Sequence, residues 1–338
     1  MKKVLSLLLI IALLLGNVAL SAPLAESSSL DDPVAPSPVE SKSDMANLLI
    51  DLETAYDAEY NALYLQSKNI SDLSFINEAF IAQYPTLEEL WLYDNQIEDL
   101  TPLSALQGLA VLSLHDNYIE NLEPLRALDS LCYLDVSNNK QLEDISPLSS
   151  LQLLATLNMS NCNISDLSPI ASLYNLGILT SVNNQIVDIS MLSGLQNLTD
   201  LYLSENPLER IEVLSQLPGL THMAIGSDST MLDFSVISTL TKLKVLNITN
   251  QELTTIAFLS PLKNLGLLNL ADNQITDISV LSELSSLRAV YFENNQITDL
   301  SPLLELPVLQ KVTVTGNPIR DEHMAELYEK GWIFNTVF

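Results

Sequence analysis

The chain has 338 residues, and its 42 acidic side chains against 14 Lys and Arg give a formal net charge of −28. A surface this acidic repels phosphate backbones and offers no basic stripe, so we expect no nucleic-acid partner. Two cysteines are too few to staple a domain of this size, so the fold must be held together by burial of hydrophobic residues, which make up 47% of the chain.

The first residues have the pattern of a secretory signal peptide. Lys2 and Lys3 precede an apolar run over 4–15, and a small-residue stretch follows at 19–22. The run is shorter than the roughly 18 residues of a spanning helix, so a membrane anchor is only the second interpretation of this segment. We therefore predict a signal peptide over 1–22 and a secreted or extracytoplasmic protein without stable membrane insertion. The cell surface and the periplasm are both open as destinations.

Two further segments precede the repeats. Residues 23–42 are rich in Ser, Pro and acid, which predicts a disordered linker. Apolar residues then recur at helical spacing over 44–56. Because a solenoid exposes its first core layer unless it is covered, we predict an N-terminal helical cap over 43–59. A longer helical segment at 75–83 in the first repeat is expected to belong to this cap.

From 60 to 319 the chain repeats a template of about 22 residues, LxxLxLxxNxIxDLSPLxxL. Its paired strand positions define twelve repeats: Leu63/Leu65, Leu90/Leu92, Leu112/Leu114, Leu134/Val136, Leu157/Met159, Leu179/Ser181, Leu201/Leu203, Met223/Ile225, Leu246/Ile248, Leu268/Leu270, Val290/Phe292 and Val312/Val314. The spacing is 22 residues, with one extra residue after the fourth and eighth repeats and five extra after the first.

Each template position has a physical role. The paired apolar residues alternate along a short strand and point inward. The Asn column, in which Cys162 replaces the amide of the fifth repeat, lies where the chain leaves the strand and can satisfy backbone groups there. The following half, DLSPLxxL, predicts a helical turn with oxygen caps and Pro at its start. Eight acids occupy the capping position: Asp72, Asp99, Asp144, Asp166, Asp188, Asp233, Asp277 and Asp299.

The repeats resemble those of the internalins, a short bacterial class of leucine-rich repeats. The resemblance rests on NxIxDLSPLxxL at 95–106, 273–284 and 295–306, and it covers about 60–319. It implies an α/β solenoid, a curved horseshoe with a parallel β-sheet on the concave face and short helical or 3-10 turns on the convex face. Internalins typically add an immunoglobulin-like domain and a cell-wall anchor. We expect neither here, so adhesion to a host cell is not inherited from the resemblance.

The end of the chain predicts a second cap over 320–338. A helix at 321–330 is followed by Gly331, and the apolar residues Trp332, Ile333, Phe334 and Phe338 are expected to cover the last core layer.

No catalytic constellation is recognisable. His115, His222 and His323 fall in different repeats or in the cap, and no phosphate loop or nucleophile elbow is present. We expect no enzyme activity, no cofactor and no metal site. The acidic column is better explained by capping than by calcium, because each acid lies one repeat from the next. Cys132 and Cys162 are too far apart for a disulfide in a regular stack, so two free thiols are expected.

The outward strand positions do not contribute to the hydrophobic core, and they form the expected binding face. Aromatic side chains gather there in the first repeats, namely Tyr64, Trp91, Tyr93 and Tyr133 with His115, and Tyr202 lies further along near His222. The leading hypothesis is a secreted, monomeric module that binds a protein or peptide. The alternative is a structural or envelope-associated protein that acts by self-association or glycan contact. The aromatic residues could instead cover a loosely packed cap junction.

Overall fold

The structure is a computed structural model, and it describes residues 52, 54–227, 232–329 and 332. All of these residues belong to one compact unit. The predicted signal peptide, the linker and most of the N-terminal cap helix lie outside the described residues, as do Ile333, Phe334 and Phe338. No helix in the described ranges is long and apolar enough to cross a bilayer.

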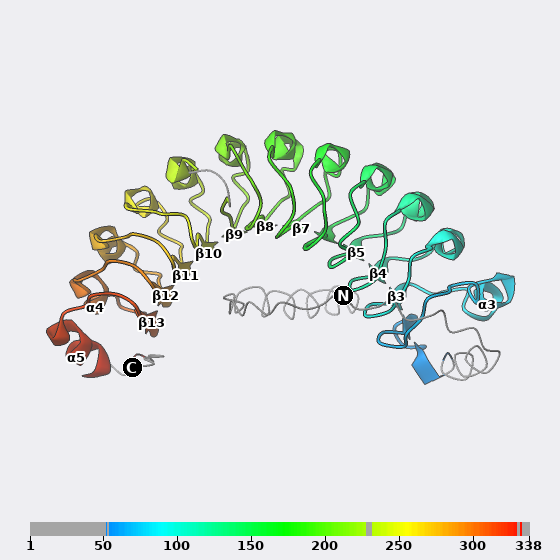
Figure 1. Cartoon of the computed structure of the whole chain (residues 1–338), viewed down its shortest axis with the longest axis horizontal. Coiled ribbons are helices and arrows are strands. Elements are labelled where there is room, and N and C mark those ends of the chain that lie inside the picture. Colours follow the sequence, from blue (N-terminus) through cyan, green and yellow to red (C-terminus); the bar gives the residue numbers. More distant parts are fainter. Residues whose placement is uncertain (1–51, 53, 228–231, 330–331, 333–338) are drawn as a thin grey trace, which may run out of the picture. The chain divides into compact units, whose positions relative to one another are not determined.

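Thirteen short strands form one sheet in strictly sequential order. They are β1 (Tyr56–Asp57), β2 (Ala62–Tyr64), β3 (Glu89–Trp91), β4 (Val111–Ser113), β5 (Tyr133–Asp135), β6 (Thr156–Asn158), β7 (Ile178–Thr180), β8 (Asp200–Tyr202), β9 (His222–Ala224), β10 (Val245–Asn247), β11 (Leu267–Asn269), β12 (Ala289–Tyr291) and β13 (Lys311–Thr313). The pair β1–β2 is antiparallel and every later pair is parallel. The strands line the inner edge of an arc in the repeat unit (Figure 1).

Short helices occupy the outer edge of the arc (Figure 1). Nine are 3-10 turns: η1 (Thr101–Ala105), η2 (Glu123–Ala127), η3 (Ser146–Ser150), η4 (Ser168–Ile170), η5 (Ser190–Gly194), η6 (Glu212–Gln216), η7 (Phe234–Thr239), η8 (Ala257–Leu259) and η9 (Ser279–Glu283). Three further elements are α-helices, α3 (Glu78–Gln83), α4 (Ser301–Leu304) and α5 (Asp321–Glu329), and Leu52, Thr54 and Ala55 are also helical. The solenoid predicted from the template is therefore confirmed, with the sheet on one side and helical turns on the other.

The predicted strand register is confirmed at every repeat. Leu63 pairs with Leu90, and Leu90 with Leu112, so equivalent template positions lie side by side across the sheet. The same one-to-one pairing continues to Val290 and Val312 in β12 and β13. The paired apolar residues are fully buried in a core that runs through the whole stack.

The Asn column forms a buried ladder of side-chain amides. The Oδ1 of Asn184 accepts from the N–H of Ile164 at 3.0 Å, and its Nδ2 donates to the carbonyl of Met159 at 2.9 Å. The amide thus joins its own repeat to the preceding one, and Asn117, Asn139, Asn206, Asn273 and Asn295 make the equivalent bonds. In the fifth repeat the Sγ of Cys162 donates to the carbonyls of Val136 and Ser160, at 3.4 and 3.5 Å.

The acidic column caps the convex turns, as predicted. In all eight repeats the Asp Oδ1 accepts the backbone N–H two residues further on, at 2.7–2.9 Å. In the third repeat Asn121 stands in this column and accepts from Glu123 N at 2.8 Å. These hydrogen bonds lower the carboxyl pKa of Asp99, Asp144, Asp188, Asp233, Asp277 and Asp299 below its ordinary value.

The ends of the stack differ in detail from the prediction. Tyr56 does not belong to a cap helix, because it pairs with Leu63 as part of β1. The helix of the first repeat begins at Glu78, three residues later than predicted, because the Asn77 side chain accepts from the N–H groups of Ala79 and Phe80 and fixes the start there.

The C-terminal helix α5 packs on the last repeat. Ile319, Met324 and Trp332 contact the core, and the Nδ1 of His323 accepts from the N–H of Leu300 at 3.3 Å. Cys132 and Cys162 do not form a disulfide with each other, as expected.

Candidate partner-binding face

The outward positions of β2–β13, together with the outward residue two positions after the last residue of each strand, form the surface that we call the concave face. Along its middle column Tyr64, Trp91, Ser113, Asp135 and Asn158 are register partners in successive strands. Neighbouring side chains in such a column are about 4.8 Å apart at the backbone. Side chains from adjacent repeats can therefore act together.

Most of the predicted aromatic residues meet in two groups on this face. The ring centroids of Tyr64 and Trp91 are 6.3 Å apart in a stacked arrangement, and those of Trp91 and Tyr133 are 6.2 Å apart. Tyr93 and His115 form a second, tighter stack at 4.4 Å. We call these five residues the aromatic patch.

The patch has exposed and supporting members. Tyr64 is exposed, and Trp91, Tyr93 and His115 are half-buried, whereas Tyr133 is only 2% exposed. Burial, with a contribution from the Asp135 carboxylate, raises the pKa of the Tyr133 phenol. Tyr133 therefore supports the ring of Trp91 more than it offers a surface of its own.

Two rings cover the strand between them. Trp91 lies in β3 and Tyr133 in β5, so their backbones are about two strand spacings, roughly 10 Å, apart. Their ring centroids are nevertheless only 6.2 Å apart, which means that both rings lean over β4. Accordingly Ser113 in β4 is 1% exposed, although its position faces outward.

A polar floor lies beside the rings. Asp135 Oδ1 accepts from Ser137 N at 2.9 Å and from Ser137 Oγ at 2.6 Å, and its Oδ2 accepts from Asn158 Nδ2 at 3.0 Å. Burial raises the pKa of Asp135, while His115 and these hydrogen bonds oppose the rise. Neither Ser113 nor Asp135 was among the predicted site residues. An acid at an outward position flanked by aromatic residues was the available signal.

Tyr202 belongs to a separate cluster in β8 and β9. The Nδ1 of His222 lies 2.9 Å from the Oδ1 of Asp200, and Thr199 Oγ1 donates to Asp200 Oδ2 at 2.5 Å. Tyr202 is 6% exposed, and burial together with Asp200 raises the pKa of its phenol. The structure therefore does not bring Tyr202 to the aromatic patch.

Carboxylates surround the patch. Asp94 and Asp116 are exposed at the ends of the third and fourth strands, where Asp94 accepts from Ser67 Oγ at 2.6 Å and Asp116 lies 2.7 Å from His115 Nδ1. The pKa of the Tyr64 phenol is raised, first by burial and then by Glu89 and Asp57. The field at this end of the face is negative.

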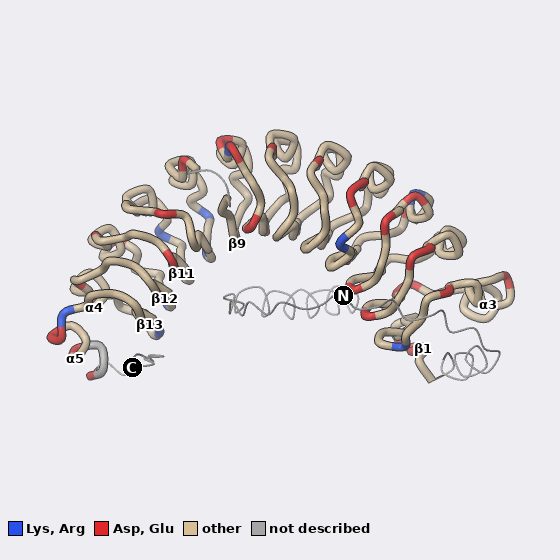
Figure 2. Tube along the Cα trace, in the orientation of Figure 1, with Lys and Arg blue, Asp and Glu red and all other residues tan. Residues whose placement is uncertain are grey.

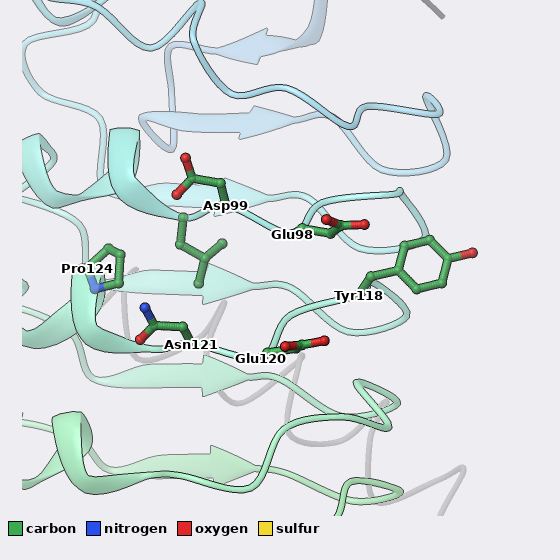
Figure 3. A pocket seen from close by; sticks show the side chains of 7 residues that line it. Glu98, Asp99, Tyr118, Glu120, Asn121 and Pro124 are labelled. Atoms are coloured by element: carbon green, nitrogen blue, oxygen red, sulfur yellow. The ribbon is translucent and has the colours of Figure 1, made fainter. Parts of the chain in front are cut away.

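A shallow cleft of about 310 Å³ lies between the second and third repeats, where each chain segment runs from its strand to its convex turn. Glu98 and Glu120 line it in equivalent positions, with Asp99 and Asn121 beside η1 and η2, and Tyr118 stands at the end away from these turns (Figure 3). The Tyr118 side chain is 57% exposed. In the described part of the chain, no group of three or more His, Cys, Asp and Glu side chains could hold a metal ion.

Comparisons with known proteins agree with this architecture. Residues 85–127, 129–172 and 263–305 match the family model described as leucine-rich repeats in two copies. No curated protein matches the chain in sequence.

Among solved structures, an internalin of Listeria monocytogenes, InlF, is 27% identical with a TM-score of 0.70, and the match covers 88% of this chain and 95% of that one. A leucine-rich-repeat protein of Leptospira interrogans is 22% identical with a TM-score of 0.63 and coverages of 76% and 74%. A chain of the mouse RP105/MD-1 complex is 23% identical with a TM-score of 0.63 and coverages of 80% and 49%. The last two share the fold. The repeats, their register and the likeness to InlF together identify the chain as a leucine-rich-repeat protein that is similar to the internalins.

Proposed function

We propose that the chain is a secreted, non-enzymatic scaffold that binds a protein or peptide partner through the aromatic patch of its concave face. The observation that carries the proposal is the pairing of partly exposed rings, Tyr64 with Trp91 and Tyr93 with His115, on adjacent repeats. Large, rigid rings that remain accessible are the side chains in which interface energy concentrates.

Related structures and the first residues of the sequence support the same function. Leucine-rich-repeat structures with this fold occur in protein complexes, as in the mouse RP105/MD-1 assembly. Export is supported by the pattern of the first 22 residues, and the boundaries of linker, caps and repeats proposed from the sequence are retained. A monomer is proposed because no second copy is needed to complete the aromatic patch.

The test is to compare Trp91→Ala with the wild-type protein in affinity capture and in thermal melting. We expect partner capture to weaken by about 2 kcal/mol or more. The melting temperature should change little, because the Trp91 ring is half-buried and lies outside the leucine core. The matched control is Tyr174→Ala, which removes an exposed ring outside the concave face and should leave both capture and melting near wild type.

Packing and binding predict different results for this pair of measurements. If Trp91 only covers a cap junction, Trp91→Ala would lower the melting temperature of the N-terminal repeats and affect capture only through unfolding. Full capture by a Trp91→Ala, Tyr93→Ala double variant would move the site elsewhere, with the Tyr202–His222 cluster the next region to test.

A further inference from the structure

Three cations follow one edge of the concave face in the last repeats. Lys244 directly precedes β10, Arg288 directly precedes β12, and Lys311 is the first residue of β13. Lys244 and Arg288 are exposed and Lys311 is half-buried. We call these three residues the basic edge, and Figure 2 shows Lys and Arg in this part of the arc, between β9 and β13.

The basic edge is kept apart from the many carboxylates of the chain. Within the described ranges none of its three cations forms an ion pair, and Lys311 Nζ lies 4.8 Å from the centroid of the Tyr291 ring instead. Four other cations, by contrast, lie next to a Glu. Arg126 lies 2.7 Å from Glu123, and Lys263 lies 2.8 Å from Glu283. The three cations of the basic edge therefore leave positive charge available for a ligand in a chain with 42 acids and 14 Lys and Arg residues.

The other end of the same edge has the opposite charge. The positions of Arg288 and Lys311 are occupied in the second repeat by Glu88 and Glu89, which precede and begin β3. The Glu89 carboxylate already contributes to the raised pKa of Tyr64. Between β4 and β9 the concave strands carry no Lys or Arg. At β10–β13 the same positions also hold two carboxylates, Asp272 and Glu293, against the three cations of the basic edge. The charge of the concave face therefore changes along its length, from strongly negative at β2–β4 to a small positive excess at β10–β13.

We propose that the partner is an extended protein segment that lies along the concave face in one direction, with its acidic end over the basic edge and its basic end over the aromatic patch. This inference rests on the proposed function and adds the charge pattern and orientation of the ligand. Nine strand spacings separate β4 from β13, about 43 Å, which roughly a dozen extended residues would span. Opposite charges at the two ends favour this direction and penalise the reverse.

The ligand is a protein segment because a uniform polyanion does not match the face. A sulfated or carboxylated polymer would gain at Lys244, Arg288 and Lys311 but would meet Asp94 and Asp116 at the other end. Only a chain with a varied sequence can present acids at one end and bases at the other. The rings of the aromatic patch add a specific contact for the basic end of the segment, since Arg and Lys pack well on Trp and Tyr faces.

The test uses two synthetic peptides of about fifteen residues with the same composition. One carries three Lys at one end and three Glu at the other, and its isomer alternates the same charges. Binding to the full chain is followed by fluorescence anisotropy at low ionic strength. We expect the block peptide to bind about five- to tenfold more tightly than the isomer, with the preference declining as salt is added. A photo-reactive group at the Glu end should cross-link to residues within 244–315.

The decisive variant is Lys244→Glu, Arg288→Glu, Lys311→Glu, which should abolish the preference for the block peptide. The neutral set Lys244→Gln, Arg288→Gln, Lys311→Gln should reduce it, and this set serves if the charge-reversed protein does not fold. The charge-matched control is Arg126→Glu, Arg210→Glu, Lys263→Glu, whose cations are exposed and locally paired. This control should keep the preference.

Several results would overturn the inference. If the two peptides bind equally tightly and Trp91→Ala weakens the binding of both, the proposed orientation is wrong but the proposed function stands. Cross-links confined to residues 62–118, or polyglutamate binding as tightly as the block peptide, would defeat it as well. If neither peptide binds and Trp91→Ala leaves partner capture unchanged, the orientation and the proposed function both fail.

Discussion

Each inward Asn amide satisfies backbone groups at a place where the strand ladder has ended. The Asn184 side chain is 3% exposed and bonds both to its own repeat and to the preceding one. The outward amide of Asn247 has no such role. Asn247 Oδ1, on the concave side of β10, has no hydrogen-bond partner. The same residue type is therefore structural at one template position and dispensable at another.

Asn184→Ala should lower the free energy of unfolding by about 2 kcal/mol or more, because Ile164 N and Met159 O lose their partner at a buried site. Asn247→Ala should stay within about 0.5 kcal/mol of wild type. Both values are obtained from chemical denaturation at unchanged slope. Equal losses for the two variants would show that the assigned repeat register is wrong.

Cys162 is the weak step in the ladder. Its thiol donates over long distances, 3.4 and 3.5 Å, where neighbouring repeats use an amide. Cys162→Asn should therefore raise the free energy of unfolding by about 1 kcal/mol, again measured by chemical denaturation. Burial raises the pKa of the Cys162 thiol to about 12, so a thiolate-directed reagent should not label Cys162 in the folded protein. Labelling of Cys162 in the folded protein at neutral pH would contradict the burial of its thiol.

Position in the template predicts direction better than it predicts exposure. The alternation rule correctly placed Tyr133 and Tyr202 on the outward side, yet both are nearly buried. The reason is cooperative. Strands about 4.8 Å apart allow a ring to lie over its neighbours, so the exposure of one outward residue depends on the side chains of two other repeats. Ser113 illustrates this, because its cover comes from Trp91 and Tyr133, and single-position rules do not contain that information.

The convex turns combine a favourable start with a fixed cap. In η1 the Pro at the start has no backbone N–H that would need an acceptor, and the Asp99 carboxylate accepts the Thr101 N–H at 2.8 Å. Protonation weakens such an acceptor. Because the folded pKa of each of these carboxyls lies below its ordinary value of 3.8, their contribution to stability is present above that value and is lost as pH falls through the lowered pKa.

Asp99→Asn, Asp188→Asn, Asp277→Asn should keep the caps at neutral pH, since Asn121 already performs this role with a 2.8 Å bond. The melting temperature of the wild-type protein should fall as pH drops below 3.8, and the triple variant should fall less steeply. The measurement is a series of thermal melts between neutral and strongly acidic pH. The triple Ala variant is the control and should already melt lower at neutral pH. Parallel curves for the wild type and the Asn variant would rule out the caps as the source of acid sensitivity.

Elements inside the repeats were predictable and elements at the ends were less so. Within the stack, each strand is specified by twelve copies of one pattern, so a deviation such as Cys162 does not shift the register. At the ends a single copy must be interpreted alone. Tyr56 fits the apolar spacing of a helix, but the open edge of β2 offers backbone hydrogen bonds, and Tyr56 and Asp57 pair there instead.

A solenoid is held together by contacts between neighbouring repeats, so its stability is close to a sum over adjacent pairs. The last repeat has only one neighbouring repeat. Its other side is covered by Ile319, Met324 and Trp332, and His323 adds a hydrogen bond from Leu300 N. The C-terminal segment thus serves as the missing neighbour.

Truncation after Asn317 should remove about 3 kcal/mol or more of stabilisation from the last repeat, because several apolar contacts are lost together. We expect a lower melting temperature and early hydrogen exchange of amides in β12 and β13, with the exchange of β4–β8 unchanged. Truncation after Glu329 keeps α5 and isolates the contribution of residues 330–338. A truncated protein with the wild-type melting temperature would mean that the segment is a tail rather than a cap.

The single antiparallel strand has a consequence for assembly. A parallel stack of similar repeats has no built-in end, since every repeat that is added presents the same strand edge to the next one. A second molecule could extend such a stack indefinitely, head to tail, and produce fibres. At the N-terminal end β1 occupies the edge of β2 and runs against the direction of every later strand. An incoming β13 edge therefore meets a strand of the wrong polarity, and polymerisation in that register has no continuing site.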